Sequence, residues 1–391
     1  MSQEELPYQG LKVYDATQGV AGPHCTMLLA LYGAEVIKVE PPEGDWGRTL
    51  GKRFEDQCAH SVAFNRGKKS IVIDLKKPEG KALAQKLASQ ADVVVESFRA
   101  GVMKRLGLGY EELSAKNPGL VYASVTGFGQ KGPRRDAQTV DGLIQAFSGF
   151  MHMNRNAAGV PQRNAMIIVD VVTGLYTFQA VQAALMRKFR FGKGSYIDSS
   201  LMQAFAALQA AKVIEHHVEN GNPQPLYIPA GMMKTADGYV MISSMRDHHY
   251  AATMEAIGRP DLIEDPRYDT RQKRVDNRAE LNKVLEAAFQ TKTTAEWEKI
   301  LSEKGVLHMR VNSYDDFLND AHVKEVGAVT WLEHDRTGKI PVAGIPGIPA
   351  PQPGSAAAHA PRIGEHTDEV LRGIGLGADE IAKLRAAGAV G

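Results

Sequence analysis

The sequence predicts an α/β fold of three layers, in which a mainly parallel β-sheet lies between two layers of helices. Short runs rich in β-branched residues alternate with stretches of helical periodicity through the first third of the chain. Several runs, such as SIVIDL and ADVVVES, are almost wholly apolar, as is typical of strands that are covered on both faces. Parallel strands need long crossover connections, which the helical stretches can provide. Together these observations indicate the three-layer class.

The elements of this sheet follow in order along the chain. The predicted strands are LKVYDA, AEVIKVE, SIVIDL, ADVVVES and GLVYASVTGFG. The predicted helices among them are CTMLLALYG and GKALAQKLASQ. Two long helices are then predicted at residues 173–188 and 199–218, because apolar residues recur there at helical spacing. Between these two helices, FRFGKGSYID contains glycines and is predicted to be a break.

A second, smaller α+β domain is predicted to follow the large one. Because Asn, Pro and Gly cluster in ENGNPQPLYIPAG, the predicted large domain covers residues 1–220 and the small domain 221–329. The small domain has a turn and strand in KTADGYVMISS and amphipathic helices in DHHYAATMEAIG, NRAELNKVLEAAFQ and TAEWEKILSEKG. Residues 330–391 are predicted to return to the large domain as a Gly/Pro-rich surface linker and C-terminal helices.

Charge and cysteine content narrow the class of protein. The 391 residues include 46 Lys and Arg against 45 Asp and Glu, so the formal net charge is +1 and no bulk field attracts nucleic acid or a membrane. Only two cysteines, Cys25 and Cys58, argue for a reducing compartment and against a disulfide framework or a Cys-rich zinc site. We see no secretory signal and no apolar run near the roughly 20 residues that span a membrane. We therefore predict a cytoplasmic protein without nucleic-acid or membrane partners.

One carboxylate, Asp170, lies in the otherwise apolar run AMIIVDVVTGLY. Removing an ionised carboxylate from water costs several kcal/mol, roughly, so such a residue is usually paired, hydrogen-bonded or used in chemistry. A helix cap is an alternative that this residue alone leaves open.

The opening of the chain imitates a dinucleotide-binding unit: a strand, the turn GVAGP, a helix, and a second strand that ends at Glu40. The glycines do not fit, because Gly19 and Gly22 are followed at once by Pro23. Proline lacks the N–H group that the helix N-terminus would offer to a pyrophosphate. A nicotinamide-dependent dehydrogenase is therefore disfavoured.

Long segments nevertheless resemble one family across nearly the whole chain. They are GVAGPHCTMLLALYGAEVIKVEPPEGD, FNRGKKSIVIDL, ADVVVESFRAGVMKRLGLGYEEL, NPGLVYASVTGFGQKGP, DGLIQAFSG, VDVVTGLY and APRIGEHTDEVL. They are similar to the class III coenzyme A transferases of the CaiB/BaiF type, which include formyl-CoA transferase-like enzymes and 2-methylacyl-CoA racemases. The resemblance implies a Rossmann-like large domain, a small domain and an interlocked homodimer.

The resemblance places Asp170 at the position of the family's catalytic aspartate. It implies that CoA moves from a short acyl-CoA, such as succinyl-CoA, to a small carboxylic or dicarboxylate-like acid through an aspartyl anhydride and an enzyme-CoA thioester. The partners would be these two substrates, and no metal or redox cofactor is required; the sequence also lacks metal-ligand spacing.

Further site residues are implied in the same way. Arg105 matches an arginine that contacts CoA phosphates, and Ser97-Phe98 stand where the family has Asn-Phe, so Ser97 is a departure. The full implied CoA-binding set is Arg105, Ser97, Phe98, Lys76, Ile73, Gly19 and Lys38. Lys68 and Lys69 offer charge near the same edge, although exposed lysines are usually only solvated.

Other residues are expected to line the active site. They are Val20, His60, Gln138, Asp141 and Gly231. A helix-capping role for Asp141 is an equal alternative. The family's mobile glycine-rich loop corresponds here to LYIPAGMMKTADG, in which Gly231 is followed by bulky methionines, so a shielding glycine loop is in doubt.

The nearest alternative function is a 2-methylacyl-CoA racemase, which needs a histidine and an aspartate to move the α-proton. Val140 stands where that histidine would lie, and valine cannot accept a proton. A catalytically silent CoA-binding protein is a third possibility, against which an intact Asp170 segment argues.

Overall fold

The structure, a computed structural model, describes residues 6–156 and 158–391. The chain divides into two compact units. The first contains the residues up to Ala210 together with Gly327–Gly391, and the second contains Ala211–Val326. The predicted bounds of the small domain, residues 221 and 329, lie later along the chain than those of the second unit, by ten and three residues.

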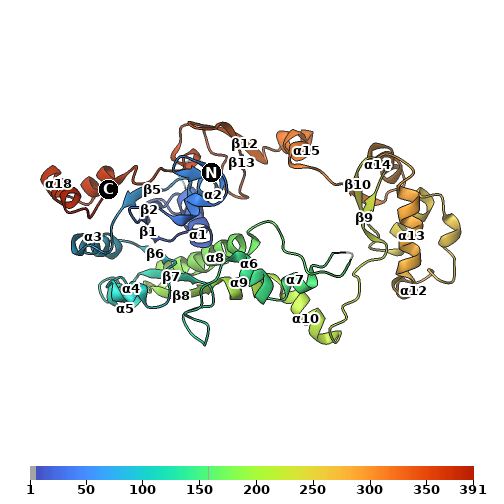
Figure 1. The fold of residues 1–391 in the computed structure, drawn as a ribbon, viewed down its shortest axis with the longest axis horizontal. Coiled ribbons are helices and arrows are strands. Elements are labelled where there is room, and N and C mark those ends of the chain that lie inside the picture. The colour runs from blue at the N-terminus through green and yellow to red at the C-terminus, as the bar shows by residue number, and fades with distance from the viewer. Residues whose placement is uncertain (1–5, 157) are drawn as a thin grey trace. The chain divides into compact units, whose positions relative to one another are not determined.

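The first unit is built on a six-stranded parallel sheet of order β5-β2-β1-β6-β7-β8 (Figure 1). The strands are β1 (Lys12–Ala16), β2 (Glu35–Glu40), β5 (Lys69–Val72), β6 (Val93–Glu96), β7 (Val121–Thr126) and β8 (Ser195–Ser200). The chain adds β2 and β5 on one side of β1, and then β6, β7 and β8 on the other. The predicted parallel α/β sheet is therefore confirmed. In such sheets, ligands bind beyond the carboxyl ends of the strands where the strand order reverses, which is here between β1 and β6.

Strand β8 was not predicted, because its segment FRFGKGSYID was interpreted as a break between helices. The structure pairs β8 in parallel with β7, from Val121 opposite Ser195 to Thr126 opposite Ser200. β8 is an edge strand whose residues are mostly half-buried or exposed, and three of its six residues are serines. Such a strand lacks the apolar run that marks the other strands of this sheet.

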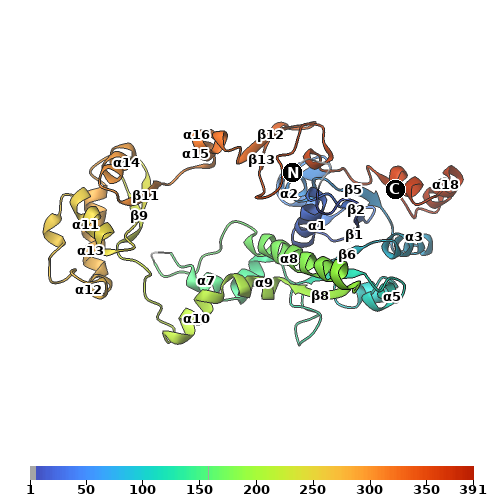
Figure 2. The same ribbon diagram turned by 180° about the vertical axis from the view of Figure 1, so that it is seen from behind.

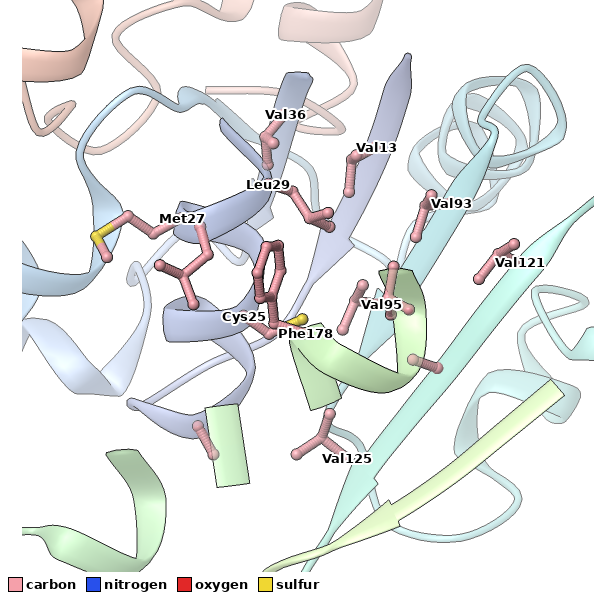
Figure 3. Close-up of a cluster of buried hydrophobic side chains, with 14 of the residues drawn as sticks. Val13, Cys25, Met27, Leu29, Val36, Val93, Val95, Val121, Val125 and Phe178 are labelled. Atoms are coloured by element: carbon pink, nitrogen blue, oxygen red, sulfur yellow. The ribbon is translucent and has the colours of Figure 1, made fainter. Parts of the chain in front are cut away.

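Helices cover both faces of the sheet, as predicted. The helices α1 (Ala21–Leu31) and α8 (Ile168–Phe191) pack on one face, where Cys25 and Phe178 meet Val95 of β6 and Val125 of β7 (Figure 3). Figure 2 shows α8 lying along this layer. The other face is covered by α3 (Pro78–Ser89), α17 (Thr367–Gly373) and α18 (Ala378–Ala386).

Helix α8 begins at Ile168, before the start predicted at residue 173, so Thr173 and Gly174 lie inside it. A Cβ atom on Gly174 would lie 2.7 Å from His24 Cβ and 2.8 Å from Ala21 O, so glycine permits α8 to pack closely on α1. By length and composition α8 alone among the described helices could cross a membrane, yet 44% of its most apolar window is buried within the chain. The predicted second helix is divided into α9 (Leu201–Leu208) and α10 (Ala210–Val218).

The second unit combines a three-stranded antiparallel sheet with helices. The strands are β9 (Ala230–Lys234), β10 (Tyr239–Ser243) and β11 (Leu307–Arg310), in the order β11-β10-β9. The helices are α11 (Asp247–Ala256), α12 (Arg271–Asp276), α13 (Arg278–Phe289), α14 (Thr294–Glu303), α15 (Tyr314–Asn319) and α16 (Ala321–Glu325). Val240 and Ile242 of the sheet pack in one core with Leu285 and Trp297 of the helices.

The remaining elements are short. They are the 3₁₀ turn Trp46–Thr49, β3 (Arg53–Phe54), β4 (Gln57–Cys58), α2 (Ala59–Asn65), α4 (Val102–Arg105), α5 (Tyr110–Ser114), α6 (Asp141–Phe147), α7 (Phe150–Met153), β12 (Val329–His334) and β13 (Gly338–Ala343). The segment after residue 330, predicted as a linker without core elements, thus contains the antiparallel hairpin β12-β13.

A buried ion pair joins the sheet to the helical layer. Lys68 Nζ lies 3.0 Å from Asp15 Oδ2, and both side chains are fully buried. Lys68 also donates hydrogen bonds to Asn65 Oδ1 and to the carbonyl oxygen of Pro23. Burial by itself raises the pKa of Asp15, but the nearby Lys68 and Lys38 lower it to about 2. Lys68 is therefore a structural cation and not the exposed charge that its sequence position suggested.

We expect Lys68→Ala to lower the free energy of unfolding by about 3 to 5 kcal/mol, because the variant leaves Asp15 buried without its closest cation. The matched control is Lys69→Ala. Lys69 is one-third exposed and pairs with the exposed Glu35 and Glu369, so its loss should cost less than about 1 kcal/mol. Urea unfolding at pH 7 measures both, and equal losses would contradict the assignment.

Candidate active site

Two adjoining cavities lie at the carboxyl edge of the sheet in the first unit. The Asp170 cavity has a volume of about 340 Å³ and the second, which we call the channel, about 620 Å³. Both are lined by Gln18, Trp46 and Phe98, which therefore form their shared wall. This position is the switch point between β1 and β6 at which α/β sheets bind ligands.

Asp170 lies in the first turn of α8 and contributes to the wall of the smaller cavity. Its backbone is held by Asp141, the first residue of α6. Asp141 Oδ2 accepts hydrogen bonds from the amides of Val169 at 2.7 Å and of Asp170 at 3.3 Å. Asp141 Oδ1 accepts one from Gln145 Nε2 at 2.7 Å. Asp141 thus caps α8, and the capping role that was open for Asp170 belongs to Asp141.

The carboxylate of Asp170 has no hydrogen-bond partner within residues 6–156 and 158–391. Burial raises the pKa of Asp170 to about 7, and the charge of Asp141 adds to the rise. A partly desolvated carboxylate that accepts no hydrogen bond from the protein is free to react with a molecule in the cavity.

Gly19 and Trp46 are in close steric contact at the shared wall. Gly19 has φ of +82°, and a Cβ atom there would lie 2.3 Å from the indole ring of Trp46. Glycine is therefore needed both for the backbone conformation and for the close approach of Trp46. The amide of Gly19 donates to Asp45 Oδ1 at 2.8 Å, so Gly19 shapes the wall without facing a ligand through a side chain.

Several predicted site residues meet at the two cavities. Ser97, Val20 and Gln138 line the Asp170 cavity, and Phe98 lines both. The hydroxyl of Ser97 is already engaged, because it accepts a hydrogen bond from the Gln18 amide at 2.9 Å.

The predicted CoA contacts are distributed along the channel. Ile73 and Lys76 line it directly. Arg105 is exposed at the end of α4, and its neighbours Val102 and Leu106 line the same channel. Arg105 therefore stands beside the channel rather than in its wall.

Asp141 and Gly19, described above, line neither cavity, and three further predicted residues lie elsewhere. Lys38 is fully buried, and its ammonium group donates to Asp45 Oδ2 at 2.8 Å and to Thr17 O at 2.9 Å, so it is used inside the protein. His60 is half-buried, places Nδ1 3.3 Å from Leu50 O and lines neither cavity. Gly231 belongs to β9 of the second unit, where it pairs with Ile242.

The sequence did not point to some residues of the Asp170 cavity. They are Gln18, Trp46, Arg135 and Thr139. Trp46 in particular follows a Gly-Asp pair in a short 3₁₀ turn and is half-exposed, and no periodicity or motif marks it. Among the residues that the structure describes, no group of three or more His, Cys, Asp or Glu side chains is arranged to hold a metal ion.

Comparisons with known proteins agree on one family. Residues 8–367 match CoA-transferase family III. The chain is 34% identical to the succinyl-CoA:glutarate CoA-transferase of Mus musculus, over 98% of this chain and 90% of the relative. It is 33% identical to the succinate–glutarate CoA-transferase of Agrobacterium fabrum, over 95% of this chain and 96% of the relative.

The fold agrees as well. The crystal structure of a CaiB/BaiF family protein from Brucella suis superimposes with a TM-score of 0.83 at 32% identity, covering 94% of this chain and 99% of that one. With the family match over residues 8–367, the sequence identities and the superposition in agreement, the protein belongs to CoA-transferase family III.

Proposed function

We propose that the protein transfers CoA from a short dicarboxylyl-CoA, such as succinyl-CoA, to a small dicarboxylate-like acid, with Asp170 as the nucleophile. The observation that carries this proposal is the carboxylate of Asp170, which faces a cavity without a hydrogen-bond partner among the described residues. The relatives named above act on succinyl-CoA or succinate and glutarate, which supports substrates of this size and charge.

The reaction is an exchange of acyl groups at one carboxylate. Asp170 attacks the thioester carbonyl, which gives a mixed aspartyl anhydride and releases the CoA thiolate. The thiolate attacks the aspartyl carbonyl, which forms an enzyme-CoA thioester and releases the donor acid. The acceptor carboxylate then attacks this thioester to give a second anhydride and CoA thiolate. Attack of the thiolate on the acceptor carbonyl gives the new acyl-CoA and restores Asp170.

The first turn of α1 is suited to the anionic species in these steps. Ala21 and Gly22 line the Asp170 cavity at the start of this helix. The first N–H groups of a helix have no partner within the helix and carry partial positive charge. We propose that these amides stabilise the oxyanion or the thiolate, whereas Pro23, which lacks an N–H, takes no part.

The channel is the proposed path for CoA. It continues from the wall at Trp46 and Phe98 to Lys76, and Arg105 stands at its side. Lys76 in the channel wall and Arg105 beside it would supply positive charge to the phosphates of CoA, and the thioester would reach Asp170 past Phe98. No metal or redox cofactor enters any step of this scheme.

The racemase alternative is not favoured by any feature of the cavity. Val140, which stands where a proton-accepting histidine would be needed, lines the wall of the Asp170 cavity. His24 is close in sequence to the site, but its Nδ1 lies 3.1 Å from the carbonyl oxygen of Val171 and its ring packs on Phe64.

We further propose an interlocked homodimer in the cytoplasm. In the first unit, Met186, Phe189 and Phe191 of α8 are 58% to 64% exposed. In the second unit, Met232 and Met309 of the sheet are 60% and 66% exposed. Exposed large apolar side chains that gather on one face mark sites of protein or membrane contact. A second copy of the chain, as the family resemblance implies, would cover these faces, and a shielding role for the segment near Gly231 would depend on it.

We expect Asp170→Ala to fold and to lose transferase activity by several orders of magnitude, because no other carboxylate lines the cavity among the described residues. Assays with succinyl-CoA and a panel of acids that includes glutarate measure this loss. Intact-protein mass spectrometry after succinyl-CoA and hydroxylamine should map a modification to Asp170. Asp379→Ala, an exposed carboxylate on α18, is the control. Activity of Asp170→Ala within about tenfold of wild type would refute the assignment.

The activity should rise with pH and level off above about pH 7, because only ionised Asp170 is nucleophilic and its pKa is raised to about 7. The profile of kcat/KM reports this group in the free enzyme.

A stability measurement checks the same group independently. Because burial raises the pKa of the folded state, ionisation of Asp170 disfavours folding, and this penalty develops between about pH 4 and pH 7. Asp170→Asn should therefore be more stable than wild type by about 3 to 4 kcal/mol at pH 8 and equal to it near pH 3. A stability difference that does not change with pH would contradict the raised pKa.

We expect Arg105→Ala to raise the KM for acyl-CoA more than it lowers kcat, because Arg105 is proposed to bind phosphates far from the reacting carbonyl. The effect should shrink as salt is added, since exposed charges are screened. Lys116→Ala removes an equal charge from an exposed position beyond α5 and serves as the control. An unchanged affinity for CoA would remove Arg105 from the site.

A further inference from the structure

A buried carboxylate that the proposed reaction does not use lies directly beneath the shared wall. Glu96 is the last residue of β6 and only 3% exposed. Its Oε2 accepts a hydrogen bond from the amide of Phe98 at 2.7 Å. An isolated buried carboxylate costs several kcal/mol, roughly, so its retention calls for a function or a set of partners.

The partners of Glu96 form a polar row across three strands. Ser124 of β7 stands directly opposite Glu96, and Asp198 of β8 stands opposite Ser124. Tyr196 donates its hydroxyl hydrogen to Ser124 Oγ at 3.2 Å. Burial raises the pKa of Glu96 to about 7 and Asp198 adds to the rise, while hydrogen bonds from Ser124 and from the Phe98 amide lower it.

This row borders a separate cavity of about 170 Å³. Glu96 and Ser124 line it together with the rings of Tyr110, Tyr122 and Tyr196. The three tyrosine rings lie 5.3 to 6.0 Å apart, centre to centre, and close the cavity on one side. Because the Asp170 cavity and the channel are not lined by Glu96, its carboxylate does not contact a ligand there.

The effect of Glu96 therefore passes through the main chain of residues 97 and 98. The Ser97 hydroxyl accepts the amide of Gln18, and the Glu96 carboxyl accepts the amide of Phe98. These two hydrogen bonds hold the segment on both sides of Ser97, and Phe98 is the side chain that it places between the two cavities. Loss of the bond to the Phe98 amide would remove the restraint that follows Ser97 and so shift the ring of Phe98.

We propose that Glu96 is a positioning residue for acyl-CoA. Its buried carboxyl group holds the main chain of Phe98, so that the Phe98 ring in the shared wall is placed to contact the substrate. This inference rests on the proposed function, because it takes the two cavities as the acyl-CoA site. A neutral carboxyl or an amide still offers an accepting oxygen to the Phe98 amide. Glutamine at this position therefore keeps the positioning bond, and alanine removes it.

The test compares Glu96→Ala with Glu96→Gln in the full-length protein. We expect Glu96→Ala to raise the KM for succinyl-CoA, and the Kd for free CoA in calorimetry, by about tenfold or more, with kcat within about threefold of wild type. Glu96→Gln should restore both constants to within about threefold. Glu111→Ala is the matched control, because Glu111 lines the same cavity from α5 but contacts neither Ser97 nor Phe98.

Hydrogen exchange supplies a readout that does not depend on activity. The amide of Phe98 should exchange faster in Glu96→Ala than in wild type, and Glu96→Gln should restore its protection. If Glu96→Ala is unstable, the same comparison can be made between Glu96→Gln and Glu96→Leu. Leucine keeps a similar side-chain volume but offers no hydrogen-bond acceptor to the Phe98 amide.

The outcomes separate this inference from the proposed function. Normal CoA affinity in both the alanine and leucine variants overturns the role of Glu96 and leaves the function intact. A loss that glutamine does not restore also overturns it, because the charge would then matter rather than the positioning bond. Wild-type protein that binds CoA without transferring it refutes the proposed reaction alone, and wild-type protein that binds no CoA refutes both.

Discussion

The position of Asp170 depends on the hydrogen bonds that the Asp141 carboxylate accepts from the first amides of α8. A helix N-terminus leaves its first N–H groups without partners, and a side chain from another helix satisfies them here. Because Asp141 is itself fixed by Gln145, the cap is rigid. At the same end of α8, His24 of α1 lies 3.1 Å from the carbonyl oxygen of Val171, and Gly174 permits the close contact between the helices. Asp170, the proposed nucleophile, thus stands on a helix that is held at its start from two directions.

The wall on the other side of the cavity depends on buried charge. The ammonium group of Lys38 donates hydrogen bonds to Thr17 O and to Asp45. Asp45 in turn accepts hydrogen bonds from the amides of Gly19 and Gly47. These bonds tie the turn after β1 to the 3₁₀ turn that carries Trp46, so that the indole ring can lie against Gly19. A buried ion pair is weak evidence for stability, because desolvation offsets much of its attraction. Here the Lys38–Asp45 pair instead fixes the conformation of the two turns. The conformation of this edge of the sheet, where we propose that the substrate binds, follows from it.

Much of the fold and part of the site could be predicted from the sequence. The apolar strands and the amphipathic helices have strong periodic signals, which is why the parallel sheet and α11, α13 and α14 were recognised. β8 was missed because its polar, partly exposed residues lack such a signal. Asp170 stood out because it interrupts an apolar run.

Other parts of the site could not be predicted, since they depend on three-dimensional contacts. Lys38 and Lys76 are both lysines near the end of a strand, but one is buried against Asp45 and the other lines the channel. Residue type alone does not distinguish them. The same holds for Trp46, whose importance comes from its contact with Gly19 across 27 residues of sequence, and for Glu96, whose partners stand on neighbouring strands.

Two opposing effects determine the charge of Asp170. Its place in the first turn of α8 favours the ionised form, by about 0.3 to 1 kcal/mol in typical cases. Asp141 already accepts the Val169 and Asp170 amides, however, so little of this stabilisation reaches the Asp170 carboxylate, and the charge of Asp141 opposes a second one nearby. Desolvation of a carboxylate costs several kcal/mol, roughly, and therefore outweighs the helix dipole. The same cap that positions Asp170 thus also keeps it poorly stabilised as an anion, and an anion of that kind gains most when it forms a covalent bond to an acyl group.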